Sequence, residues 1–236
     1  MRTLSFIFVL IFAVGVSAQS TAVVKPFREG TKFANSDEFE KALSFYQSAL
    51  EAAKSERIGN DFLGRLHYNL GVCSYRLHRL EKSVEYLGMA ISMRKGDYSA
   101  AYYALGMAET ARENWPQARL AFLGALKGNR TNGEAWFDLA SVYILEKNFA
   151  GAELAFRNSV AYKSIDSPLS HNNIGVILAM KKDFAAAETE FETALEQSGG
   201  RLIEARKNLE YCRMRNRELI AKLEFDYNNK KLWIKF

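Results

Sequence analysis

The sequence contains few of the residues that build disulfide-rich, metal-binding or β-sheet proteins. Its 236 residues include only two cysteines, three histidines and three prolines. Two cysteines cannot form the dense disulfide framework of a small secreted domain. Long stretches without proline, together with scarce strand signals, favour helices. After residue 18 there is no apolar run long enough to cross a bilayer.

Catalytic motifs are also missing. The sequence has no glycine-rich phosphate loop, no HExxH zinc motif and no GxSxG nucleophile motif. His67, His78 and His171 are not next to a cysteine or to a carboxylate pair at ligand spacing. The glutamates between residues 188 and 196 are more typical of a solvated helix face than of an acid–base pair. These observations predict a protein that is not an enzyme, with no metal site and no cofactor.

A repeated residue pattern runs through most of the chain instead. A small residue is followed four positions later by a large apolar one, and three positions after that by another small residue. The first small residues follow one another at intervals of 41, 35, 34 and 35; they are Ala42, Ser83, Ala118, Ala152 and Ala187. Residues three and four apart share one helix face, so each pattern predicts a helix with an apolar seam.

A second cluster precedes each pattern by twelve or thirteen residues. It consists of a large apolar residue and a small one, as in Leu70-Gly71, Leu105-Gly106, Leu139-Ala140 and Ile174-Gly175, with Glu29-Gly30 as a degenerate copy. The small residue lets a second helix approach closely, and the aromatic residue of that second helix fills the seam. Each copy is therefore expected to be a pair of packed helices.

A period near 34 with these two clusters resembles the tetratricopeptide repeat, a helix–turn–helix unit. The resemblance implies an all-α fold, a right-handed α-solenoid of about five helix pairs within residues 19–200. The copies are expected at about residues 23–57, 64–97, 99–132, 133–166 and 168–200. Other helical repeats share the period, but they do not usually carry the Leu-Gly cluster ahead of the second pattern. The longer first interval holds about seven extra residues, close to two turns, which predicts a lengthened helix ending near Gly59 and Asn60.

Two further segments follow the repeats. Residues 201–224 form an amphipathic segment that suits a capping helix, which a repeat array needs at its end. Residues 201–236 contain ten Lys or Arg and five Asp or Glu. We interpret the excess of basic residues as part of a solvated helix face. The alternative is that these residues contact an anionic partner. The tail, residues 225–236, is aromatic, and Asn228-Asn229 suggests a turn. It is expected to dock on an apolar surface of this chain or of a partner, including a second copy, or to pack locally on the capping helix.

The first 18 residues are typical of a secretory signal peptide. Arg2 precedes an apolar stretch, and Val16-Ser17-Ala18 forms a small-residue cleavage site before Gln19. The alternative is an uncleaved membrane anchor, but about fifteen apolar residues are short for a span of roughly 20. We expect export to the periplasm or the extracellular space, or to the secretory lumen of a eukaryote. After cleavage no stable membrane span would remain, and nucleic acid would not be a partner.

The two cysteines are predicted to be packing residues. Cys73 and Cys212 are separated by four repeats, and packed helices lie roughly 8–10 Å apart. Their expected separation of tens of Å exceeds the limit of about 7 Å between the Cα atoms of a disulfide.

The resemblance also implies a binding surface. In tetratricopeptide arrays, positions 2, 5, 9, 12 and 13 of each repeat line a concave groove formed by the first helices. Carried over to this chain, these positions predict an aromatic and apolar groove with few charges. Its predicted partner-contacting residues are Tyr68, Tyr75, Tyr103, Met107, Phe137, Ile144 and Asn172. A carboxylate clamp is not expected, because Phe27, Thr31, Ala100 and Ala104 stand where its polar residues would be.

These features together predict a non-catalytic protein–protein interaction scaffold of the cell envelope or secretory compartment. The partner is expected to be a protein or peptide segment in the groove. One alternative is an accessory subunit that regulates an envelope enzyme or a secretion complex through the basic end. Another is a structural protein that assembles with itself.

Overall fold

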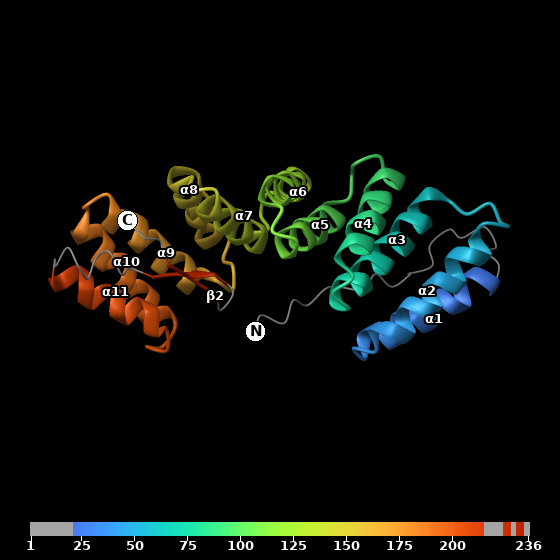
Figure 1. The fold of residues 1–236 in the computed structure, drawn as a ribbon, viewed down its shortest axis with the longest axis horizontal. Helices are drawn as coiled ribbons and strands as arrows, with labels where there is room; N and C mark the ends of the chain where they lie inside the picture. The colour runs from blue at the N-terminus through green and yellow to red at the C-terminus, as the bar shows by residue number, and fades with distance from the viewer. Residues whose placement is uncertain (1–20, 215–223, 228–229, 234–236) are drawn as a thin grey trace. The chain divides into compact units, whose positions relative to one another are not determined.

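The computed structural model describes residues 21–214, 224–227 and 230–233 (Figure 1). Eleven helices and two strands lie within them. They are α1 (Thr21–Asn35), α2 (Phe39–Ala53), α3 (Asn60–Arg76), α4 (Leu80–Met93), α5 (Ser99–Ala111), α6 (Trp115–Gly128), α7 (Gly133–Leu145), α8 (Phe149–Ala161), α9 (Ser167–Met180), α10 (Phe184–Gln197), α11 (Ile203–Met214), β1 (Glu224–Tyr227) and β2 (Lys230–Trp233).

The chain divides between residues 128 and 129 into two compact units. In the N-terminal unit the helices pack as the pairs α1–α2, α3–α4 and α5–α6, and each pair lies against the next. In the C-terminal unit α7 packs on α8 and α9 on α10, while α11 lies against both α9 and α10. The prediction of an all-α array of helix pairs is confirmed.

Some predicted segments lie outside the described residues, and two short strands add to the predicted helices. The signal segment and the predicted turn at Asn228-Asn229 lie outside the described residues, as does the second half of the predicted capping helix. β1 and β2 pair antiparallel, with Glu224 opposite Trp233 and Tyr227 opposite Lys230. No helix within residues 21–214 is both long enough and apolar enough to span a membrane.

The predicted lengthened helix is wrong. α2 ends at Ala53, and the extra residues form the connection 54–59 and the first turn of α3, whose N-cap is Gly59. Lys54 and Ser55 bond back to the carbonyls of Glu51 and Ala52, which closes the helix in short turns. Ile58 packs on the core of the first two pairs and anchors this connection.

In four of the five pairs the seam depends on a glycine of the first helix, and α7 has Ala140 at this position. A Cβ built on Gly71 would lie 2.6 Å from Leu87, and one on Gly106 would lie 2.6 Å from the ring of Phe122. In the C-terminal unit a Cβ on Gly175 would meet Phe191 at the same distance. The three large side chains are completely buried. The backbone of the first helix therefore contacts the second helix directly.

The turn inside each pair repeats with the same geometry. Each of the five turns has three residues, and its second residue has positive φ; these residues are Asp37, His78, Glu113, Lys147 and Lys182. The N–H of the next residue bonds to a carbonyl five positions earlier, as from Arg79 to Ser74 at 2.8 Å. This is the Schellman closure of a helix C-terminus, here with a non-glycine residue in the left-handed position.

Side-chain caps start several of the helices. The predicted caps Asn148 and Asp183 accept hydrogen bonds from the backbone N–H groups of Gly151 and Ala186, at 3.0 and 3.3 Å. Asn132 caps α7 in the same way through Ala135, at 2.9 Å. A side-chain acceptor here satisfies a donor that the helix cannot pair internally.

The cysteines are free and buried, as packing residues should be. Cys73 lies in the core of the N-terminal unit, where burial raises the pKa of its thiol to about 12. Cys212 lies in the core of the C-terminal unit. Each thiol is thus enclosed within a different compact unit.

Ion pairs connect three helices of the C-terminal unit. Glu153 on α8 accepts hydrogen bonds from Arg157, at 2.8 Å, and from Lys181 at the end of α9, at 2.6 Å. Arg157 also reaches Glu190 on α10, at 3.4 Å, and Glu190 contacts His171 at 2.6 Å. Burial alone would raise the pKa of Glu153, but the hydrogen bonds and charges of Lys181 and Arg157 outweigh it and lower that pKa.

The glycine seam can be tested with Gly106→Ala. The added methyl group would overlap the buried ring of Phe122, so we expect a loss of about 1–3 kcal/mol in the free energy of unfolding measured with urea. Gly88→Ala is the matched control, because nothing lies within 4 Å of its Cβ position on α4. That change should stabilise the chain by about 0.5–1 kcal/mol. Equal effects of the two substitutions on stability would contradict the close contact between Gly106 and Phe122.

The pairing of Glu153 can be tested with Glu153→Gln. Because the folded-state pKa of Glu153 is lowered, its contribution to stability is present above the unfolded-state value of 4.5 and is lost as the pH falls through the folded value. The wild type should therefore be more stable than the variant at neutral pH, and the difference should vanish in acid. Denaturant unfolding across pH measures this. Glu196→Gln, at an exposed position of the same unit, is the control for removal of a surface charge.

Candidate partner-binding surface

The first helices of the repeats supply the surface on which partner contact is predicted. We call it the first-helix surface: α1, α3 and α5 in the N-terminal unit, and α7, α9 and α11 in the C-terminal unit. Neighbouring first helices touch where α1 meets α3, α3 meets α5 and α9 meets α11. Repeat positions 5, 9 and 12 recur along these helices. The surface therefore continues from one first helix to the next at each of these three contacts.

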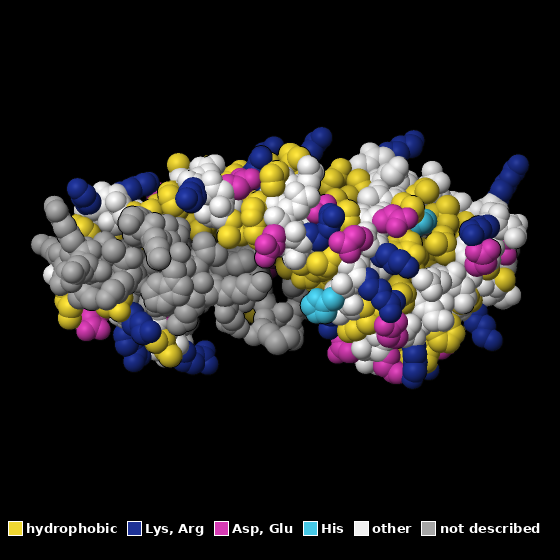
Figure 2. All heavy atoms as spheres, viewed as in Figure 1, with side chains coloured by type: hydrophobic (Ala, Val, Ile, Leu, Met, Phe, Trp, Pro, Cys, Tyr) yellow, Lys and Arg dark blue, Asp and Glu magenta, His cyan; other side chains and the backbone are white. Residues whose placement is uncertain are grey.

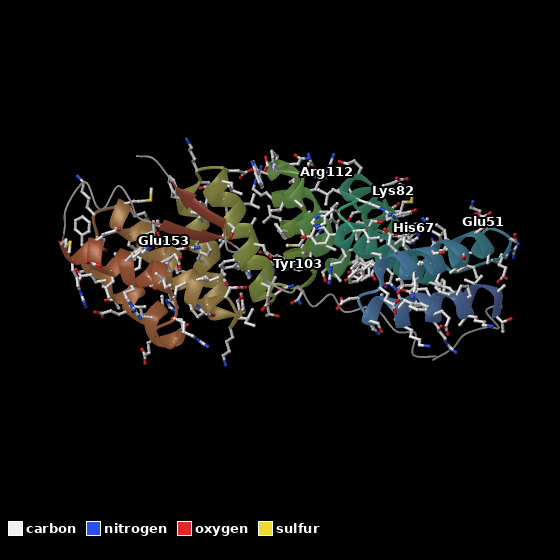
Figure 3. All side chains as sticks on the ribbon, turned by 60° about the horizontal axis from the view of Figure 1, so that its bottom comes forward. Glu51, His67, Lys82, Tyr103, Arg112 and Glu153 are labelled. Carbon is white, nitrogen blue, oxygen red and sulfur yellow. The ribbon has the colours of Figure 1, made fainter. Side chains whose placement is uncertain are left out.

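In the N-terminal unit the predicted residues differ in exposure. Tyr68 and Met107 are buried, with 3% and 5% of their surface exposed. Tyr75 and Tyr103 are partly exposed. Tyr103, labelled on α5 in Figure 3, also packs its ring 5.8 Å from that of Phe122. Tyr75 and Tyr103 are thus the aromatic side chains of this set that a partner can reach without a rearrangement of the unit.

Tyr68 belongs to a packed aromatic and cationic cluster. Its ring lies 5.3 Å from that of Tyr98, and the guanidinium of Arg94 lies 4.7 Å above the Tyr98 ring. Burial raises the pKa of Tyr98 to about 12, against the lowering effect of the Arg94 and Arg65 charges. Burial also raises the pKa of Tyr68. Both phenols are therefore neutral at physiological pH, and the ring of Tyr68 holds α3 to the start of α5.

The charged residues of this unit are largely paired with one another. Arg65 on α3 bonds to Asp61 at 2.8 Å, and Arg76 bonds to Asp37 at 3.1 Å. Figure 2 shows the result over the N-terminal unit, where Lys and Arg side chains stand beside Asp and Glu instead of forming a block of one sign. The face of the N-terminal unit seen in this view therefore carries no block of one sign.

In the C-terminal unit the three predicted residues are buried. Phe137 packs edge-on against Phe156, with ring centroids 5.6 Å apart, and Ile144 lies in the same core. Asn172 on α9 is completely buried. For all seven residues, contact with a partner stays a prediction.

Asn172 is part of an amide network that joins two first helices. The side-chain amide of Asn208 on α11 donates to Oδ1 of Asn172 at 2.9 Å, and Asn172 donates to Oδ1 of Asn173 at 3.1 Å. Sequence reasoning missed Asn173 and Asn208. A signal was present, because Asn208 follows Asn173 by 35 residues, the repeat interval, and therefore occupies the same position in a sixth first helix.

An extended segment of the chain lies on this part of the surface. β1 packs against α9 and also against α11, the two first helices that the asparagines join (Figure 1). The first-helix surface of the C-terminal unit thus holds extended backbone in the structure itself.

Three arginines on and just before α11 contact other residues of the same unit. Arg213 contacts Glu188 at 3.7 Å and Glu192 at 2.5 Å, and Arg206 donates to the carbonyl of Gly200 at 2.7 Å. Arg201 donates to the carbonyl of Ser198 at 2.9 Å. These contacts agree with a helix face that is neutralised locally. Arg215 and Arg217 lie outside the described residues.

The histidines of residues 21–214 take part in contacts of the fold. No cluster of three His, Cys, Asp or Glu side chains there has the geometry of a metal site. His67 bonds to the carbonyl of Leu63 at 2.8 Å, and His171 lies between Glu190 and Gln197. Both histidines serve contacts between or within helices.

Comparison with known proteins agrees with this architecture. Residues 103–168 match the family model of the tetratricopeptide repeat. A search with the sequence found no match among curated proteins.

Three solved structures illustrate the likeness of the fold. MamA is 21% identical with a TM-score of 0.66, over 76% of this chain and 93% of that one. A tetratricopeptide repeat protein from Parabacteroides merdae is 17% identical with a TM-score of 0.68, over 86% and 77%. YrrB, described as a tetratricopeptide-repeat protein with an unusual peptide-binding site, is 20% identical with a TM-score of 0.59, over 75% and 88%. Residues 103–168 therefore carry the tetratricopeptide repeat, and the helices of the chain have the α-solenoid fold of these solved structures.

Proposed function

We propose that this protein is a non-catalytic scaffold that binds an extended segment of a partner protein along its first-helix surface. The observation that carries the proposal is the position of β1, an extended segment that lies against α9 and α11. Addition of peptide to a preformed surface is a recurring mode of recognition. The peptide-binding site named for YrrB supports the same use of this fold.

Affinity on the N-terminal unit is expected to come from apolar and aromatic contact. The partly exposed Tyr75 and Tyr103 lie at repeat positions 12 and 5 of adjacent first helices, α3 and α5. Tyrosine supplies a large rigid surface with one polar group, and such residues dominate binding energy at interfaces. The nearby charges are already paired, so binding should change little between low and moderate salt.

The protein is further proposed to act after export. The apolar stretch before Val16-Ser17-Ala18 and the absence of a cysteine after it support a cleaved secretory signal. The compartment would then be the periplasm or extracellular space, or a secretory lumen. In this setting the scaffold would bind protein segments of the same compartment.

The binding surface can be tested with peptides selected from a library of random linear sequences. Their affinity for the full-length protein would be measured by fluorescence anisotropy, and again after Tyr75→Ala plus Tyr103→Ala. We expect a loss of about tenfold or more, since truncated interface anchors cost more than 2 kcal/mol. Leu120→Ala on α6 is the control, because this side chain is 54% exposed on a second helix.

The thermal midpoint of each variant shows whether folding is preserved. Peptides that bind the double variant normally but lose affinity for the Leu120 variant would place recognition on the second helices and refute this proposal. A strong decrease of affinity with salt would contradict its apolar character.

Export can be tested by the intact mass of protein secreted from its native host. The expected mature chain begins at Gln19, and its mass should show two free thiols. Both cysteines should resist alkylation in the native state, because they are buried and the pKa of Cys73 is raised to about 12. Both should react after denaturation without reductant. A retained signal segment, or thiols that react only after reduction, would contradict the prediction.

A further inference from the structure

The C-terminal hairpin is held by two kinds of contact, the pairing of its two strands and the packing of β1 on helices. β1 and β2 form an antiparallel pair of four residues each, with Phe225 opposite Leu232 and Asp226 opposite Lys231. β1 also lies against α9 and α11. Two-stranded hairpins are marginally stable alone in water, so packing on the helices supplies the support that the hairpin needs.

The helices that contact β1 are first helices, and the groove positions of α9 are covered. Asn172 and Ala179, at repeat positions 5 and 12, are buried. Their counterparts on α5, Tyr103 and Thr110, stay partly exposed. Among the described residues, β1 lies against both α9 and α11. These two positions of α9 are therefore not accessible to a partner in the structure.

We propose that the hairpin, residues 224–233, is an internal occupant of the first-helix surface at α9 and α11 and competes there with an extended partner segment. This inference rests on the proposed function. The chain itself then carries a ligand for α9 and α11. Removal of the hairpin would free these two helices for the partner.

The sequence of β1 indicates the chemistry of the competing partner. β1 reads Glu-Phe-Asp-Tyr, so acidic and aromatic residues alternate. In an extended segment alternate residues point to opposite faces, so one face of such a segment is aromatic and the other acidic. The amide network of Asn172, Asn173 and Asn208 joins the two helices that β1 contacts. The expected partner is an extended segment with alternating aromatic and acidic residues.

The short connection to α11 makes the internal occupant an effective competitor. α11 ends at Met214 and β1 begins at Glu224, so nine residues lie between them. A ligand on a short tether acts at an effective concentration on the order of millimolar. A free segment of equal intrinsic affinity would therefore bind the full-length protein far more weakly than it would bind a chain without the hairpin.

The test uses a chain that ends at Leu223 and a fluorescent peptide of residues 224–236. Anisotropy should detect binding of the peptide to the shortened chain, and binding to the full-length protein should be at least about tenfold weaker. A scrambled peptide should not bind. In the shortened chain Asn172→Ala should weaken binding, whereas Leu154→Ala, at a side chain of α8 that is 64% exposed, should leave it unchanged.

Circular dichroism shows whether the shortened chain remains helical. If it unfolds, the full-length protein with a protease site inserted after Arg217 is cleaved after folding instead. The severed tail should then co-elute with the chain at high concentration and be displaced by excess peptide of residues 224–236. A tail that separates at once, or that the peptide does not displace, would overturn the proposal.

The outcomes separate this inference from the proposed function. If the peptide binds the full-length and shortened chains equally, or binds neither while both are folded, the hairpin is not a competitor. Library peptides that still depend on Tyr75 and Tyr103 would leave the proposed function standing in that case. If the tail peptide behaves as expected but no library peptide depends on those tyrosines, the role of the hairpin as a competitor is confirmed. The proposed function at the N-terminal unit then fails.

Discussion

The close contact between a glycine of the first helix, present in four of the five pairs, and a large side chain of the second helix is the constraint on which the packing depends. At Gly71, Gly106 and Gly175 there is no space for a Cβ, because Leu87, Phe122 and Phe191 occupy it. Each of these side chains is buried completely and fills the seam that the glycine opens. Dense packing of this kind gains many small dispersion contacts, which a wider helix separation would lose.

The same position explains how the array of pairs ends. Glu210 on α11 follows Gly175 by 35 residues and is therefore its counterpart in a sixth first helix. A glutamate offers no groove for an aromatic side chain, and its exposed charge would be costly to bury. α11 still packs inward through Ala205, Leu209 and Cys212. It therefore closes the core of α9 and α10 without providing a seam for a further helix.

Much of this fold could be predicted from spacing because the repeat acts through local geometry. The intervals between Ala42, Ser83, Ala118, Ala152 and Ala187 correspond to real helix pairs, and Asn148 and Asp183 cap helices as their residue type suggests. The connection at residues 54–59 was mispredicted, because two helical turns and a loop anchored by Ile58 preserve the same interval. Local spacing does not distinguish them.

The candidate surface was less predictable, because exposure depends on neighbours that no single repeat contains. Tyr68 and Tyr103 have the same repeat position, yet Tyr98 covers the first, while the second stays partly exposed. The link between Asn172 and Asn208 requires the packing of α11 on α9. The position of β1 likewise follows from tertiary contact. A surface formed by several repeats is a property of their assembly, which periodicity alone does not contain.

The turns within the pairs determine where this chain can change its length. All five have three residues, a positive-φ residue in the middle and the same backbone hydrogen bond, so an inserted residue would break the closure. The connections between pairs contain four to six residues. Length variation during evolution, and loops grafted by design, are therefore tolerated between pairs and not within them. New recognition elements can be added at the pair-to-pair edge of the molecule while every helix keeps its partner.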